Sequence, residues 1–247
     1  MNPFAHVPEF FPVTMQLYVL LMMALVVAGT IIDLKHKKSA DFFFANSKKQ
    51  QANAERQLNQ AQKTPIIIKT LTTDILLSAE FHNPQRRLAH LLKMYGFILF
   101  LFSTLIMVFT GAGGLWGLLW HVGALMVCVG GYWFWFKLRV DVSAEGHQWY
   151  EVVPADLFIL SLLGTTTFAL AWSVTHSSLF FSLFILSSTI LFGSVRWSKF
   201  AHMFFKPAAA VQKHLAKADG SRDNLPAPAD KPAQFGLGIK RELPQHY

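Results

Sequence analysis

Four of the ten histidines lie at the ends of long apolar stretches, where an imidazole can ligate a membrane-embedded cofactor. His90 begins one such stretch and His202 closes another, so antiparallel helices would bring both to the same boundary. At 1.5 Å per residue, His90 lies about 31 Å from the turn at Gly111. His202 lies about 36 Å from Ser178 by the same rise. Two neutral imidazoles at matching depth on facing helices can hold a b-type haem from opposite sides, which predicts one bis-histidine haem b.

Basic side chains cluster at the level of these two histidines and suit the two propionates of a haem. Arg87 and Lys199 are the predicted propionate partners. Lys93, one turn after His90, lies at the edge of the apolar stretch and is a candidate for hydrogen bonding to a quinone. The alternative for Lys93 is that its ammonium reaches the nearby membrane surface. Gly96 is expected to leave room for a flat macrocycle.

Histidines at helix ends are also common without any cofactor, so a coincidental pair remains an alternative interpretation of the spacing. A second pair, His121 and His176, lies at the opposite boundary. That pair is a weaker haem candidate because it lacks nearby cations and lies at the edge of the hydrocarbon. The other six histidines are in loops, in the leader or in solvated segments.

Long apolar stretches must position these residues. The chain has 247 residues, of which 53% are hydrophobic and 15% charged, and the apolar residues occur in blocks. A helix needs roughly 20 apolar residues to cross a bilayer, and barrel strands would be shorter and alternating. The sequence therefore predicts an all-α integral membrane protein with five transmembrane helices. Their apolar cores are Gln16–Ile32, Met94–Thr110, Gly114–Phe136, Leu157–Val174 and Ser178–Val195. Five tryptophans near their ends are expected to be interfacial anchors: Trp116, Trp120, Trp133, Trp135 and Trp172.

The positive charges predict the orientation of this bundle. Five spans leave three outer segments, residues 1–15, 111–114 and 175–178, and none contains any of the 22 Lys and Arg residues. The positive-inside rule then predicts an N-out, C-in protein of the plasma (inner) membrane. This distribution also accounts for the net charge of +8 without a nucleic-acid partner. Cys128 is the only cysteine, which excludes disulfides and cysteine-ligated clusters within the chain.

The remaining segments divide the chain into four parts. Residues 1–33 hold an outer leader, without a recognisable cleaved signal peptide, and the first span, and residues 34–86 form a cytoplasmic loop. Residues 87–206 form the other four spans, and residues 207–247 are predicted to be a disordered cytoplasmic tail. Within the loop, Asn46–Lys63 is typical of an exposed helix. The more apolar Pro65–Ala79 is expected to lie on the membrane surface or against a partner.

Three motifs in the chain resemble one family of membrane proteins: Arg86–Phe97, Trp197–Pro207 and Asp156–Leu163. They are similar to segments of the membrane cytochrome b subunits related to the respiratory nitrate reductase gamma chain. That family includes membrane subunits of quinone-interacting oxidoreductases. Size and the long first loop also resemble the membrane anchor of adenylylsulfate reductase from sulfur metabolism.

The resemblance implies roles for individual residues. His90 and His202 match the ligands of the haem b nearest the cytoplasm, whereas Phe100 and Phe184 stand where family members have the ligands of a distal haem. The resemblance therefore implies a single haem b. It also implies partners: cytoplasmic flavin and iron–sulfur oxidoreductase subunits, with quinone as the mobile carrier.

Two functions of different class follow. The first is an electron-transfer membrane subunit that itself performs no group-transfer chemistry, and the second is a haem-free membrane anchor or assembly protein. A small transporter is disfavoured because internal repeats and broken helices are lacking. The polar run Thr165–Thr167 is interpreted as helix packing rather than as a substrate site.

Overall fold

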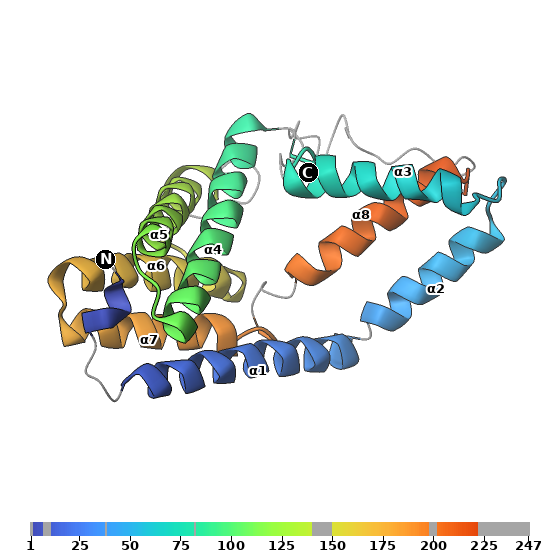
Figure 1. Cartoon of the computed structure of the whole chain (residues 1–247). Coiled ribbons are helices and arrows are strands. Elements are labelled where there is room, and N and C mark those ends of the chain that lie inside the picture. Colours follow the sequence, from blue (N-terminus) through green and yellow to red (C-terminus); the bar gives the residue numbers. More distant parts are fainter. Residues whose placement is uncertain are drawn as a thin grey trace. The chain divides into compact units, whose positions relative to one another are not determined.

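The computed structural model describes residues 2–6, 11–37, 39–81, 83–139, 150–197 and 202–221. These residues are almost entirely helical and contain no strand (Figure 1). The chain divides into two compact units. The membrane unit comprises Met1–Asp33, Leu88–Arg139 and Trp149–Ala201, and the loop unit comprises Leu34–Arg87, Val140–Gln148 and His202–Tyr247.

The α-helices are α1 (Phe11–Lys37), α2 (Ser39–Ala52), α3 (Gln60–Thr70), α4 (Pro84–Thr110), α5 (Leu115–Trp133), α6 (Leu157–Thr175), α7 (Ser178–Gly193) and α8 (His202–Ala218). The shorter elements are 3-10 turns η1 (Pro3–His6) and η4 (Pro154–Asp156), and π-helical segments η2 (Leu71–Leu76) and η3 (Phe134–Leu138).

Four helices of the described residues are long and apolar enough to cross a membrane. They are Val13–His36, Pro84–Thr110, Leu115–Leu138 and Leu157–Thr175. The prediction of a helical membrane protein is thus confirmed in its coarse form. The expected fifth span is shorter, because α7 has 16 residues, about 24 Å at the helical rise. It ends at Gly193, and a turn follows in which the Trp197 amide donates to the Ser194 carbonyl at 2.9 Å.

Helices α4 and α5 approach each other closely through glycines. A Cβ added at Gly96 would lie 2.7 Å from the Gly123 carbonyl oxygen, and one added at Gly130 would lie 2.8 Å from the Ala89 carbonyl oxygen. Small residues allow such backbone contact between membrane helices. The expectation that Gly96 leaves room for a macrocycle was therefore wrong. The space beside Gly96 is filled by the backbone of α5 around Gly123 and Val127.

Aromatic rings fill the half of the membrane unit nearest the Gly111 turn. Trp120 is 0% exposed and Trp172 is 4% exposed, and Trp135 at the other end of the bundle is 6% exposed. All three were therefore wrongly expected to be interfacial anchors. The Trp120 indole nitrogen donates to the Thr104 hydroxyl at 2.9 Å, which satisfies its polar atom inside the core. The buried members of this aromatic core are Phe100, Met107, Trp120, Ala124, Ala169, Trp172 and Phe184.

Helix α1 packs along one stripe only. Met15 and Met22 are buried, seven residues apart, and the Tyr18 hydroxyl between them lies 2.7 Å from the Ser188 hydroxyl of α7. Near its other end, a Cβ on Gly29 would lie 3.0 Å from the Val195 Cβ. Most other apolar side chains of α1 are exposed, as expected for a helix that faces lipid.

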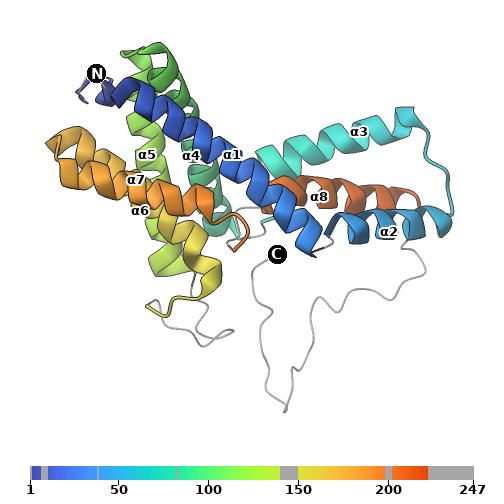
Figure 2. The same cartoon turned by 90° about the horizontal axis from the view of Figure 1, so that it is seen from below.

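The loop unit is formed by α2, α3, η2 and α8, with α8 in contact with the other three (Figure 2). The expected single helix at Asn46–Lys63 is divided instead, because α2 ends at Ala52 and α3 begins at Gln60. Asn59 caps α3 in a capping box, accepting from the Gln62 amide at 2.9 Å. The expected change to a disordered tail at Pro207 was misplaced, since α8 continues through that residue to Ala218. Residues 222–247 lie outside the described part of the chain.

Candidate functional site

His90 is half-buried on α4, in the membrane unit. Seven residues later on the same face, Phe97 is buried, and its ring centroid lies 6.4 Å from that of Phe192 on α7. The stripe of α4 that carries His90 therefore runs along the side that contacts α7. An imidazole at this position can serve as an axial ligand to a haem iron.

His202 is the first residue of α8 and belongs to the loop unit, whereas His90 belongs to the membrane unit. The expectation that His202 closes the fifth apolar helix was wrong, because α7 ends at Gly193. The depth calculated for His202 along one continuous helix does not apply for that reason. Its role as a ligand remains a prediction.

The predicted cationic residues have different surroundings. Arg87 donates from Nε to the Leu77 carbonyl at 2.8 Å and so holds the chain that precedes α4. The Lys93 ammonium lies 3.8 Å from the centroid of the Phe134 ring, a cation–π contact on the α5 side of α4. Lys199 lies outside the described residues. Lys93 is thus held by the protein itself, which its sequence environment did not indicate.

The positions that would carry a distal haem are filled by packed rings. Phe100 and Phe184 meet edge to face with centroids 6.4 Å apart. Trp120 packs on Phe100 at 5.1 Å, and Trp172 stacks on Phe184 at 6.1 Å with the planes 9° apart. The residues present at this end of the bundle do not fit a second haem, because the macrocycle would have to displace four buried rings.

The other pair of helix-end histidines has structural contacts. His121 Nδ1 lies 2.6 Å from the Gly117 carbonyl oxygen, and its Nε2 lies 3.1 Å from the Ser173 hydroxyl of α6. His176 ends α6 in the left-handed conformation, with φ of 52°, and its amide donates to the Trp172 carbonyl. These two histidines join and terminate helices, so the weaker haem candidate is not supported.

The polar run Thr165–Thr167 contributes to packing between α5 and α6. The Thr167 hydroxyl lies 2.9 Å from the Tyr132 hydroxyl, and the Cys128 thiol lies 3.4 Å from the Thr166 hydroxyl. Thr165 bonds back to the Ser161 carbonyl of its own helix. These contacts agree with the interpretation of the run as helix packing.

A buried ion pair joins the end of η3, which follows α5, to the start of α6. The sequence analysis did not predict this pair. Arg139, directly after η3, binds Asp156 through both guanidinium and carboxylate forks, and both side chains are about nine-tenths buried. The Arg139 guanidinium also lies 4.3 Å from the centroid of the Trp135 ring. In the sequence, the pair was indicated only by one basic and one acidic residue, which lie at the adjacent ends of two consecutive apolar stretches.

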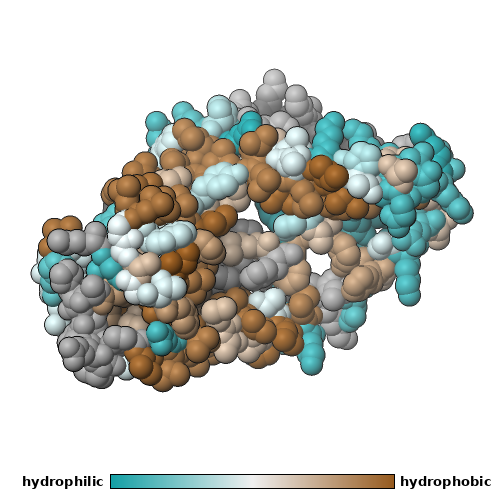
Figure 3. Space-filling model, viewed as in Figure 1, coloured by the Kyte–Doolittle hydropathy of each residue, from teal (hydrophilic) through white to brown (hydrophobic). Residues whose placement is uncertain are grey.

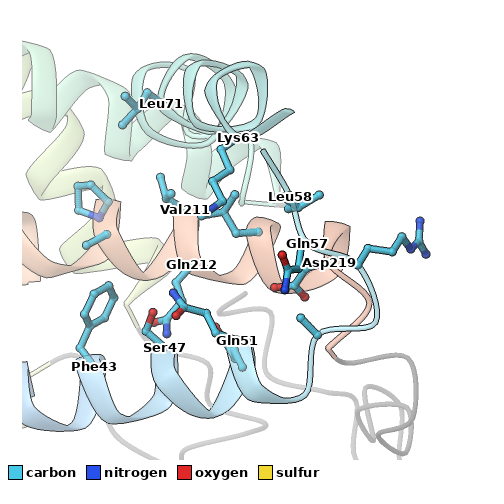
Figure 4. Close-up of a pocket in the computed structure, with 16 residues that line it drawn as sticks. Phe43, Ser47, Gln51, Gln57, Leu58, Lys63, Leu71, Val211, Gln212 and Asp219 are labelled. Atoms are coloured by element: carbon cyan, nitrogen blue, oxygen red, sulfur yellow. The ribbon is translucent and has the colours of Figure 1, made fainter. Parts of the chain in front are cut away.

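The loop unit contains a half-open groove of about 590 Å³ between α2, α3 and α8. Figure 4 shows Phe43 and Ser47 of α2 on the side of α8 that carries Gln212. The side-chain nitrogen of Gln212 is buried there without a hydrogen-bond partner. The lining mixes apolar and amide side chains, and the described residues contain no group of three or more His, Cys, Asp or Glu able to hold a metal ion. Such a lining suits a polypeptide segment better than an ion.

Comparison with known proteins identified no matching protein-family model, no matching curated protein and no matching solved structure. The resemblance of the three motifs therefore carries weight only as a hypothesis.

Proposed function

We propose that this chain is the membrane anchor and electron-transfer subunit of a cytoplasmic flavin and iron–sulfur oxidoreductase, resembling that of adenylylsulfate reductase. Electrons would pass between that enzyme and the quinone pool through a single haem b. The observation that carries the proposal is an asymmetry along α4. His90 lies half-buried on the stripe that contacts α7, whereas the Phe100 position further along α4 is closed by packed aromatic rings.

The proposed topology has five spans, with the N-terminus outside and the loop unit in the cytoplasm. Four helices meet the length and composition of a span. Crossing by α7 would complete the fifth span, and the turn after Gly193 would extend its reach toward the membrane surface. The distribution of the 22 Lys and Arg residues supports this orientation.

A bound haem b would supply one-electron transfer at a potential that its axial ligands and surroundings adjust. His90 and His202 are the proposed axial ligands, with Arg87 and Lys199 as propionate partners. Lys93 is the proposed hydrogen-bond donor to quinone. Imidazole nitrogens are common axial ligands of haem iron, and Arg and Lys side chains suit its propionates.

One observation favours a second candidate, a haem-free anchor. His202 begins a helix of the loop unit, separate from the apolar helix that precedes it. The groove in the loop unit would then bind a segment of the soluble enzyme, and the chain would only hold that enzyme at the membrane.

A reduced-minus-oxidised absorbance spectrum of the purified full-length chain from haem-replete cells separates the two candidates. The electron-transfer function predicts a sharp b-type α band that corresponds to one haem per chain. A well-folded preparation without any haem band would exclude that function and retain the anchor. A content of two haems per chain would contradict both candidates.

A further inference from the structure

The groove between α2, α3 and α8 lies within the loop unit and is lined by one face of α8. The α8 side chains that line it recur every three or four residues: Ala208, Val211, Leu215 and Asp219. In Figure 3, teal and brown atoms both lie on the visible surface of α3 and α8, so polar and apolar side chains are mixed there. The groove volume of about 590 Å³ falls within the range of about 300–1,000 Å³ typical of ligand sites.

The lining of this groove is incompletely covered by the described residues. Leu71 is 40% exposed, and Phe43 and Val211 are only half-buried. The side-chain nitrogen of Gln212 is buried without a hydrogen-bond partner, which is costly and uncommon in folded proteins. A polypeptide segment in the groove would cover the apolar side chains. Its carbonyl groups could accept a hydrogen bond from Gln212 after a rotation of that side chain.

The chain itself continues from one end of the groove. Asp219 is the last lining residue of α8, and its carbonyl accepts a hydrogen bond from the Arg56 amide at 3.1 Å. The Ser221 amide then donates to Asp219 Oδ1 at 2.9 Å. Residues 222–247 follow, outside the described part of the chain. Any segment of these residues is therefore tethered beside the groove.

One segment of residues 222–247 matches the lining of the groove. Phe235-Gly-Leu-Gly-Ile239, here called the tail segment, has a large apolar residue at every second position. In an extended backbone these side chains would share one face, and the two glycines would leave the other face bare. Five extended residues span about 17 Å, and the α8 face from Ala208 to Asp219 spans about 16 Å. The tail segment thus fits the groove in length as well as in polarity.

The linker to the tail segment favours this occupant over a separate molecule. Phe235 is 14 residues after Ser221, and that many residues can span up to about 46 Å. Attachment through a linker of this length gives an effective concentration on the order of millimolar. A contact too weak to hold a separate molecule at micromolar concentration would therefore form within the chain.

We propose that the tail segment docks in the groove between α2, α3 and α8 of its own chain. Its three apolar side chains lie against the lining, and one of its carbonyl groups accepts the hydrogen bond from Gln212. A soluble-enzyme segment that binds the groove, as in the haem-free anchor candidate, would have to displace the tail segment. The proposal does not depend on whether a haem is bound.

The test measures disulfide formation between the tail segment and the groove in the full-length chain in detergent. A Cys128→Ser background removes the native thiol, and Gln234→Cys places a thiol directly before the tail segment. The second thiol is either Ala208→Cys, exposed in the groove, or Lys217→Cys, exposed on α8 outside the lining. Lys217 is nearer to residue 234 in the sequence, so tethering alone would favour this control. Copper phenanthroline starts the oxidation, and mass spectrometry follows the intramolecular disulfide.

The proposal predicts that Ala208→Cys forms the disulfide several-fold faster than Lys217→Cys. A second pair on α2 repeats the comparison, with Ser47→Cys in the groove and Lys49→Cys outside the lining. Each pair is measured separately, so a variant that fails to assemble leaves the other pair. Equal rates within a folded pair would show that the groove does not hold the tail segment and would overturn the proposal.

Two further measurements separate this occupant from others. Leu237→Ser, at the centre of the tail segment, should lower the rate at Ala208→Cys to that at Lys217→Cys, whereas Leu225→Ser should leave it unchanged. An unchanged rate in Leu237→Ser would overturn the assignment of this segment. Chains with only Gln234→Cys are also mixed with chains that carry only Ala208→Cys. A dimer formed as fast as the intramolecular product would assign the groove to a second copy and overturn the proposal. The haem spectrum of the same preparations reports on the proposed function independently.

Discussion

Arg139 and Asp156 form a buried two-fork ion pair that joins the end of η3 to the start of α6. The Asp156 carboxylate also accepts the Val153 amide at 3.0 Å, and the Trp135 ring covers the guanidinium. The pair thereby joins the segment that follows α5 to the segment that precedes α6. Both charges are satisfied by partners, which is the condition under which buried charges are tolerated.

Arg139→Ala should destabilise the membrane unit by about 3–5 kcal/mol, because it leaves the Asp156 carboxylate buried without its counter-charge. Thermal or denaturant unfolding in detergent measures the loss. Lys206→Ala is the control, since its pair with Glu80 is exposed and should contribute no more than about 1 kcal/mol. Equal effects of the two substitutions would show that the buried pair does not clamp the helices.

Phe184→Ala should destabilise the bundle by about 3–5 kcal/mol, because it removes a ring from a core that cannot collapse around the gap. Leu186→Ala is matched to it on the same helix, where Leu186 is exposed, and should have a much smaller effect. Haem content per folded chain should stay unchanged in both variants, because the proposed ligands lie elsewhere. Loss of haem from folded Phe184→Ala would instead assign a cofactor to this end of the bundle.

Gly96→Ala should weaken assembly of α4 on α5, because its Cβ would lie within 2.9 Å of α5 backbone atoms. The expected result is a lower unfolding temperature and less protein in the monodisperse fraction after detergent extraction. Gly193→Ala is the control on α7, where an added Cβ meets nothing within 4 Å. A Gly96→Ala protein as stable as the parent chain would contradict the close contact.

His90→Ala and His202→Ala should each abolish haem incorporation while membrane insertion remains, because low-spin ligation needs both imidazoles. His214→Ala, on the same helix as His202, is the matched control for loss of a histidine and should retain haem. Haem per chain from the difference spectrum is the measurement. Normal haem in a folded His202→Ala protein would exclude that residue as a ligand.

The apolar helices were predictable because their signal is local. Blocks of apolar residues in α1, α4, α5 and α6 are long enough to require a helix in lipid whatever they contact. The end of α7 was less predictable. Apolar residues continue through Val195, whereas the helix stops at Gly193 and the chain turns.

The candidate site was predictable only in part. The register of His90 on α4 follows from helical periodicity, and the substitution of Phe100 and Phe184 for ligands was read from the resemblance. The contacts of Lys93 with Phe134 and of Gly96 with Gly123 were not predictable, because they depend on which helix lies beside α4. The same holds for Trp120, whose aromatic character alone is equally compatible with an interface and a core.

The sequence by itself determined the helical membrane character of the chain and the segregation of its basic residues, because hydrophobicity and charge act through solvent and are properties of each segment. Only the tertiary structure decided which side chains meet. Long-range contacts such as Arg139 with Asp156, Phe100 with Phe184 and Tyr18 with Ser188 join positions far apart in the chain. Their formation depends on the packing of whole helices, which no single segment encodes.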